Sequence, residues 1–227
     1  MGAENGAGPK RIVFYDLDGT LVDTRRDIAN AVNHMRATLG LAPLPEGEIC
    51  GYVGLGLRQL VESCLPDGAD AARVEHAMKV YRAFYTEHLL DHTRLYAGVR
   101  EVLEHFRARG LAQAVITNKP NPFSRQILEA LGVAGFFLEI VGGDSLWPKK
   151  PDPQALVALL EREQVRPAQA LFVGDSPIDV ETGARAGVLT VVVAQGFSSR
   201  AELERAQPDR TVKDFRELLA LARKEGW

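Results

Sequence analysis

The chain has 227 residues, of which 46% are hydrophobic and 25% are charged, and its net charge is -3. This composition is typical of a globular protein with an ample core, in one large domain or two smaller ones. The charge gives no basic footprint for nucleic acid, and no apolar run is long enough to span a membrane. We therefore expect a cytoplasmic protein with neither a nucleic-acid nor a membrane partner. The two cysteines, Cys50 and Cys64, are expected to be reduced thiols.

Residues 1–10 are rich in Gly and Ala and are expected to form a loose tail. The first predicted element is a buried strand over the apolar run at 12–15. Asp16 and Asp18 follow it directly, and Gly19 allows a sharp turn after them. Ligands of open α/β sheets bind at this end of a strand.

Two carboxylates so close together repel each other, so Asp16 and Asp18 need a cation or a shared proton. Mg²⁺ suits hard oxygen ligands of this kind. One carboxylate can then attack a phosphorus atom while the other handles the proton. The alternative interpretation of this segment is a turn followed by a helix cap.

A long stretch after this turn has helical signals and no convincing strand. Asp23 or Thr24 can cap a helix that runs to about residue 39, where Gly40 ends it. Between 48 and 95 the apolar residues recur at three- and four-residue spacings. By element length this is a helical insert of roughly 70 residues. We expect it to lie as a cap over the carboxyl end of the first strand.

From residue 96 onwards, predicted helices and strands alternate. Strands are predicted at 111–116, 138–141, 170–173 and 189–193, with a short one at 211–212, and helices at 99–109, 122–131, 153–163, 178–186 and 215–224. This alternation indicates a parallel, doubly wound sheet with right-handed crossovers. The predicted fold class is therefore α/β, with a Rossmann-like core of residues 11–23 and 96–227 and an inserted helical cap domain at 24–95.

Two further strand ends carry polar residues. Thr117 and Asn118 bring a hydroxyl, an amide and helix-terminal N–H groups to one turn, a combination that can bind phosphate oxygens. The loop after the next strand holds Lys149 and Lys150 before Pro151, and a lysine fixed there can neutralise a phosphate. Either lysine can serve, and Lys150 is preferred because it directly precedes the proline. A helix cap and a solvated loop lysine are the alternatives.

The following strand end carries Asp175 and, four residues later, Asp179. Together they can complete an oxygen-rich metal site. The alternative is a helix N-cap with an acidic first turn. Any one of these strand ends is weak evidence alone, but polar motifs at successive strand ends of one sheet edge favour a common site.

The motifs at these strand ends, taken in order, strongly resemble those of the haloacid dehalogenase-like superfamily of phosphohydrolases. The resemblance spans nearly the whole predicted core, and the helical insert is similar to the cap of the subgroup with cap type one. It implies a Mg²⁺-dependent phosphomonoester hydrolase that acts through an aspartyl-phosphate. In that case Asp16 is the nucleophile, and Asp18 is the general acid and then the base. Both would also be metal ligands, Asp18 through its backbone carbonyl.

The resemblance assigns roles to the other motif residues too. Thr117 and the N–H of Asn118 would hold the phosphoryl group, and Lys150 would offset its charge. Asp175 would bind Mg²⁺, with Asp179 as a direct or outer ligand.

The cap is expected to provide specificity for a small phosphorylated metabolite. The turn at Gly54 and Gly56 exposes N–H groups to an anion, Arg58 can bind a substrate carboxylate, and Lys119 is a second candidate for that role. The resemblance implies 2-phosphoglycolate as the substrate. The alternatives are a phosphatase or phosphomutase for another small metabolite such as a sugar phosphate, or a non-catalytic binding module. A monomer and a homodimer are both compatible with the sequence.

Overall fold

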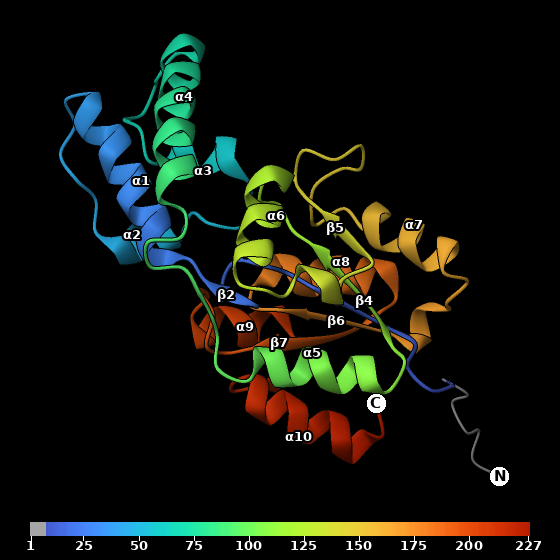
Figure 1. The fold of residues 1–227 in the computed structure, drawn as a ribbon. Coiled ribbons are helices and arrows are strands. Elements are labelled where there is room, and N and C mark those ends of the chain that lie inside the picture. The colour runs from blue at the N-terminus through green and yellow to red at the C-terminus, as the bar shows by residue number, and fades with distance from the viewer. Residues whose placement is uncertain (1–7) are drawn as a thin grey trace.

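A six-stranded sheet forms the centre of the computed structural model, which describes residues 8–227 (Figure 1). Its strand order is β5-β4-β1-β6-β7-β8, and all neighbouring strands are parallel. The strands are β1 (Ile12–Tyr15), β4 (Ala112–Ile116), β5 (Glu139–Val141), β6 (Ala170–Gly174), β7 (Leu189–Val193) and β8 (Arg210–Val212). The predicted α/β fold class is confirmed. The chain winds outward in opposite directions on the two sides of β1, and the resulting crevice at the carboxyl ends of the strands is where such sheets bind ligands.

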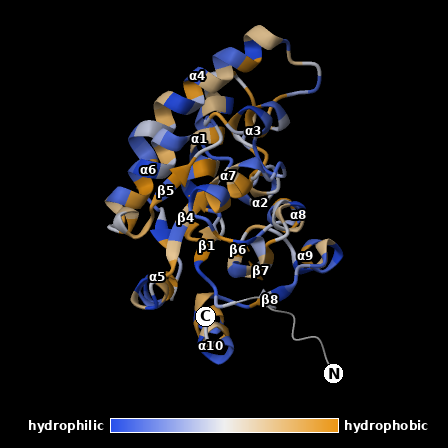
Figure 2. Cartoon of the chain, turned by 90° about the vertical axis from the view of Figure 1, so that its right-hand side faces the viewer, coloured by the Kyte–Doolittle hydropathy of each residue, from blue (hydrophilic) through white to orange (hydrophobic). Residues whose placement is uncertain are grey.

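Helices cover both faces of the sheet because successive strand residues point to opposite sides. Val13 and Tyr15 of β1 belong to one apolar cluster with α5 (Val99–Ala108) and α10 (Phe215–Glu225). Ile12 and Phe14 belong to a second cluster with α7 (Gln154–Arg162). The remaining helices of the core are α6 (Asn121–Ala130), α8 (Pro177–Ala186) and α9 (Arg200–Ala206), with short 3-10 turns at Ala134–Phe136 and Pro167–Gln169. In Figure 2 the orange, apolar segments gather where strands and helices meet.

Four helices lie together at one end of the sheet, and we call them the helical insert (Figure 1). They are α1 (Arg25–Thr38), α2 (Glu46–Cys50), α3 (Leu57–Ser63) and α4 (Ala71–His88). The longest two, α1 and α4, pack against each other through apolar faces that include Ile28, Val32 and Tyr81. An amphipathic stripe on each helix explains this packing, because each apolar face is buried against the other.

The chain enters and leaves the helical insert through two short strands, β2 (Val22–Asp23) and β3 (Arg94–Leu95), which pair antiparallel. The expectation of no strand between 24 and 95 is therefore wrong for β3, because a strand of two residues has no periodicity to detect. Asp27 of α1 reinforces this crossing, since its Oδ2 accepts hydrogen bonds from the N–H groups of His92 and Thr93 at 2.9 and 2.8 Å.

Cys50 and Cys64 are both buried and unbridged, as expected. Within residues 8–227, no helix combines the length and apolarity needed to cross a bilayer. Helix α9 was not predicted, because its seven residues carry mostly charged side chains and bury only Leu203. The first seven residues of the expected tail lie outside the described residues.

Candidate active site

Three buried side chains from distant parts of the chain meet at the carboxyl end of β1. Asp16 follows β1, Lys150 lies in the loop between β5 and α7, and Asp179 belongs to the first turn of α8. The Lys150 ammonium lies 2.8 Å from Asp16 Oδ1 and 2.7 Å from Asp179 Oδ1. The carboxylates raise the pKa of Lys150 above its usual value, outweighing the opposing effect of burial. Lys150 is therefore a fixed positive charge between two carboxylates.

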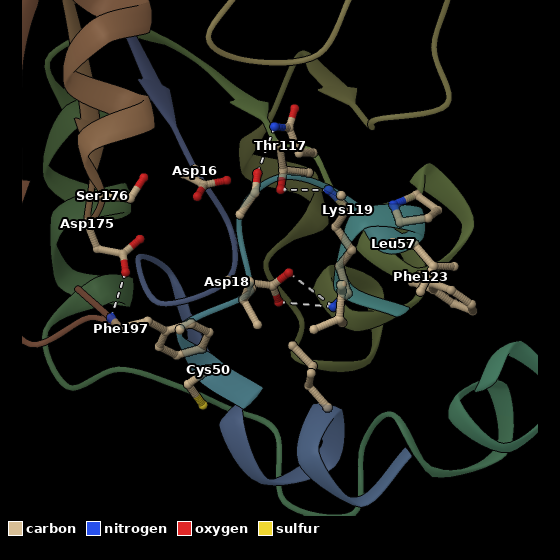
Figure 3. A pocket seen from close by; sticks show the side chains of 18 of the residues that line it. Asp16, Asp18, Cys50, Leu57, Thr117, Lys119, Phe123, Asp175, Ser176 and Phe197 are labelled. Atoms are coloured by element: carbon tan, nitrogen blue, oxygen red, sulfur yellow. Dashed lines mark hydrogen bonds and ion pairs between the residues drawn. The ribbon is translucent and has the colours of Figure 1, made fainter. Parts of the chain in front are cut away.

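Asp175, at the end of β6, is held in place from several sides (Figure 3). Its Oδ1 accepts a hydrogen bond from the hydroxyl of Thr20 at 3.0 Å, and its Oδ2 accepts one from the N–H of Phe197 at 2.7 Å. Gly19 and Gly196 approach it so closely that a Cβ on either would lie 2.2 Å from an Asp175 side-chain atom. Both positions therefore require glycine, and the carboxylate has little freedom to rotate.

A divalent cation fits this group of carboxylates. Oxygen atoms of Asp16, Asp175 and Asp179 lie within 4.8 Å of one another, and all three residues are buried. Burial raises the pKa of Asp16 from 3.8 to about 6, opposed by the Lys150 charge and reinforced by Asp179. Burial, together with Asp179 and Asp16, raises the pKa of Asp175 well above its usual value. Buried negative charge in excess of the lysine, on hard oxygen donors, matches the preference of Mg²⁺.

Because the pKa of Asp16 is raised, we expect the stability of the metal-free protein to depend on pH. The folded protein binds this proton more tightly than the unfolded chain, so stability falls as pH rises from about 4 to 6. Removing the charge with Asp16→Asn should relieve a cost of about 3 kcal/mol at pH 8 and raise Tm by about 5 °C or more. The measurement is thermal unfolding in a chelator at pH 4 and pH 8.

The benefit of Asp16→Asn should disappear near pH 4, where the wild-type carboxyl is also protonated. Asp67→Asn is a matched control, because Asp67 is exposed and distant in sequence from the cluster. Equal Tm values for wild type and Asp16→Asn at pH 8 would contradict the buried-charge interpretation.

Asp18 forms a second ion pair across the pocket from Asp175 (Figure 3). The Lys119 ammonium lies 3.0 and 3.1 Å from the two Asp18 carboxylate oxygens, and it donates to the Tyr85 hydroxyl at 2.8 Å. The Thr24 hydroxyl also donates to Asp18, at 2.7 Å. Thr24 is the residue before α1, so the expected helix-capping hydroxyl is turned to the pocket instead. Tyr85 belongs to α4, and Lys119 thus connects the sheet edge to the helical insert.

Thr117 and Asn118 follow β4 and line the same pocket. The Thr117 hydroxyl accepts the N–H of Lys119 at 3.3 Å. The Asn118 side chain donates to the carbonyls of Gly54 at 2.7 Å and Lys150 at 2.9 Å, and it accepts the N–H of Lys150 at 2.9 Å. The Asn118 side-chain amide therefore fixes the loop that contains Lys150 against the insert. Because this amide is occupied, only the backbone N–H of Asn118 would be available to a phosphate.

The two lysines considered for the loop after β5 separate clearly. Lys150 is buried among the carboxylates, whereas Lys149 is exposed. The Lys149 ammonium lies against Gly56, where a Cβ would come within 2.8 Å of it. The structure thus brings Lys150, the preferred candidate, to Asp16.

The candidates in the insert separate as well. Gly54 and Gly56 line the pocket, in a turn that requires positive φ angles of 119° and 96°. Arg58 does not line it. Its side chain is 49% exposed and pairs with Glu62 at 3.1 Å and with Glu75. The expected role of Arg58 in substrate binding therefore has no geometric support, whereas Lys119 is already in the pocket.

Apolar side chains close the pocket on the side of the insert and α6. They include Leu57 and Phe123, which are labelled in Figure 3, and also Leu60, Tyr81 and Tyr85. Sequence reasoning missed Tyr85, Thr20 and Phe197 as site residues. Tyr85 reads as an ordinary apolar position on a helix, and Phe197 lies in a loop with no motif. Thr20 alone had a usable signal, because it immediately follows the Asp-x-Asp-Gly turn.

The family model described as haloacid dehalogenase-like hydrolase matches residues 13–193, and the chain belongs to this family. A phosphoglycolate phosphatase of Pseudomonas putida is 39% identical over 215 residues, covering 92% of this chain and 78% of that protein. One of Nitrosospira multiformis is 38% identical over 220 residues, covering 95% of this chain and 97% of that protein.

The fold agrees with these relatives. The crystal structure of a predicted phosphoglycolate phosphatase from Haemophilus somnus has a TM-score of 0.90 at 29% identity, covering 96% of this chain and 100% of that one. The protein is a phosphatase of this family and, by reaction class, a phosphoric monoester hydrolase.

Proposed function

We propose that the protein hydrolyses 2-phosphoglycolate with Mg²⁺, through a phosphoryl group carried on Asp16. The observation that carries this proposal is the pairing of two charged features in one pocket. The Asp16 and Asp175 carboxylates line the pocket with the buried Asp179 close by and form one, and the Lys119 ammonium beside Asp18 forms the other. The first suits a metal and a phosphate, and the second suits the carboxylate of an acidic substrate. The relatives named phosphoglycolate phosphatase support the same substrate.

The proposed first chemical step uses Asp16 and Asp18, which both line the pocket. Asp16 attacks the phosphorus atom, a P–O bond forms to its carboxylate, and the ester P–O bond breaks. The substrate carboxylate would take the Lys119 ammonium from Asp18, and Asp18, then protonated from water, gives this proton to the departing alcohol oxygen. Lys150 offsets the charge on the phosphoryl group. Asp16, the backbone carbonyl of Asp18, and Asp175 would hold Mg²⁺, with Asp179 as a direct or outer ligand, and the bound ion supplies positive charge between two anions.

The second step returns Asp16 to its starting state. Asp18, now a carboxylate, takes a proton from a water molecule that attacks the phosphorus of the aspartyl-phosphate. The P–O bond to Asp16 breaks, and inorganic phosphate leaves. The Thr117 hydroxyl and the backbone N–H of Asn118 hold the phosphoryl oxygens in both steps.

The position of Lys119 favours a very small acid. Asp18 must reach the ester oxygen, and in 2-phosphoglycolate a single carbon separates that oxygen from the carboxylate. A cation that already contacts Asp18 is therefore close enough to bind the substrate carboxylate. The Tyr85 hydroxyl lies beside the same ammonium, and Phe123 and Leu57 limit the space beyond it.

The experiment is a measurement of kcat/KM for phosphate release from 2-phosphoglycolate, 2-hydroxyethyl phosphate and a set of sugar phosphates. We expect 2-phosphoglycolate to exceed 2-hydroxyethyl phosphate by about tenfold or more, because only the former has a carboxylate for Lys119. Chelation of the metal should abolish the rate for every substrate. A preference for a sugar phosphate would retain the hydrolase and reject the substrate. A rate that survives chelation would reject the metal.

A further inference from the structure

Arg25, the first residue of α1, lies between the helical insert and the sheet. Its guanidinium Nη2 donates hydrogen bonds to the carbonyls of Gln195 at 2.7 Å and Gly196 at 2.8 Å, and to the Tyr96 hydroxyl at 3.2 Å. The same group lies over the ring of Phe197, 5.1 Å from its centre. Arg25 therefore joins both ends of the insert, at α1 and just after β3, to the loop that follows β7.

This loop is the one that holds Asp175. The N–H of Phe197 donates to Asp175 Oδ2, and Gly196 packs directly on the Asp175 side chain. Residues 195–197 thus contact Arg25 on one side and a predicted metal ligand on the other. Figure 3 shows Phe197 and Asp175 on the same wall of the pocket.

The location of Arg25 is costly for a helix. A cation in the first turn is unfavourable, because the helix N-terminus already carries partial positive charge. The bonds to two carbonyls and a stacked ring offset this cost. Arg26, the next residue, is exposed, whereas Arg25 is half-buried against its partners.

We propose that Arg25 is a positioning residue for the metal site, acting on Asp175 through the Gln195–Gly196–Phe197 loop. Its Nη2 holds the two loop carbonyls while the planar guanidinium lies over the Phe197 ring, and the fixed loop keeps the Phe197 N–H aimed at Asp175 Oδ2. Outer groups that orient a ligand in this way affect metal affinity. Because Arg25 also contacts Tyr96, it links the segment just after β3 to this ligand as well. The inference rests on the metal site of the proposed function.

The test is a titration of the full chain with Mn²⁺ in the absence of substrate. The EPR signal of free Mn²⁺ measures how much of the metal is bound. For Arg25→Ala we expect the Kd for Mn²⁺ to rise about five- to tenfold, because the loop is freed but Asp175 remains. Arg26→Ala, with the same loss of charge in the same turn, should bind like wild type. Asp175→Ala marks the loss of the site itself.

A kinetic split separates positioning from general damage. In Arg25→Ala the Mg²⁺ concentration for half-maximal activity should rise by about the same factor as the Mn²⁺ Kd, while the substrate KM at saturating Mg²⁺ stays near the wild-type value. Should Arg25→Ala fail to fold, Arg25→Lys provides the same test. Lysine keeps the charge but has a compact ammonium in place of the planar guanidinium. We therefore expect the Arg25→Lys variant also to bind Mn²⁺ more weakly than wild type.

The outcomes distinguish the two proposals. Equal Mn²⁺ affinity in wild type, Arg25→Ala and Arg25→Lys would overturn the role of Arg25 and leave the metal site standing. Wild-type protein that binds no more Mn²⁺ than Asp175→Ala would overturn the proposed metal site, and the inference with it. If Arg26→Ala weakened Mn²⁺ binding as much as Arg25→Ala does, the inference would also be overturned. The effect would then come from the loss of positive charge alone.

Discussion

Asp16→Asn is expected to abolish phosphate release, with kcat lowered by about 10⁴-fold or more. The amide has almost the shape of the carboxylate but cannot attack phosphorus, so the covalent route is lost while the pocket is kept. Asp16 is buried at the end of β1, and its carboxylate lies 2.8 Å from the Lys150 ammonium. We expect no neighbouring side chain to take over its attack on phosphorus. The measurement is phosphate release from 2-phosphoglycolate with saturating Mg²⁺.

Two further readouts make this result specific. Wild type quenched with acid during turnover should contain a phosphoryl group on the Asp16 peptide, detected by mass spectrometry, and Asp16→Asn should contain none. Asp67→Asn, which removes an exposed carboxylate outside the pocket, should turn over like wild type. Substantial turnover by Asp16→Asn would show that another group attacks phosphorus.

Lys119→Met is expected to lower kcat/KM for 2-phosphoglycolate by about 10²- to 10³-fold. The side chain is only 6% exposed, so in the proposed role its ammonium would meet the substrate carboxylate with little water to weaken the attraction. The same variant also leaves Asp18 without its ion-pair partner, which affects every substrate. The informative quantity is therefore the ratio of kcat/KM for 2-phosphoglycolate to that for 2-hydroxyethyl phosphate, which should fall by about tenfold or more.

Arg58→Ala is the matched comparison, because Arg58 is the other cation that the sequence offered for the substrate carboxylate. Its guanidinium pairs with Glu62 and Glu75 on an exposed surface, so the variant should leave the substrate ratio unchanged. If Arg58→Ala lowered the ratio and Lys119→Met did not, the assignment of the carboxylate site would be reversed.

The sequence alone was enough to predict the sheet and the polar and charged groups at its edge. Asp16, Thr117, Lys150 and Asp175 each follow a predicted strand or its loop, and parallel strands place their carboxyl ends at one edge. Short-range patterns contain this information, because strand periodicity and the residues just after a strand are both local. The helical insert was predictable for the same reason.

Only the tertiary structure decided which of several similar side chains reach the carboxylates of the site. Lys149 and Lys150 are neighbours in sequence, and the path of their loop buries one and exposes the other. Arg58 lies on a helix whose outer face pairs it with glutamates, while Lys119 reaches Asp18 and a tyrosine 34 residues away.

The pairing of β2 with β3, the Thr24 hydroxyl on Asp18 and the Arg25 contacts with the loop after β7 were equally beyond local pattern. Each depends on how two segments distant in sequence pack together. The sequence by itself therefore determined the fold class and the chemical groups available at the sheet edge. The packing of the insert against the core determined which of those groups meet, because side-chain direction depends on long-range contacts that no local pattern records.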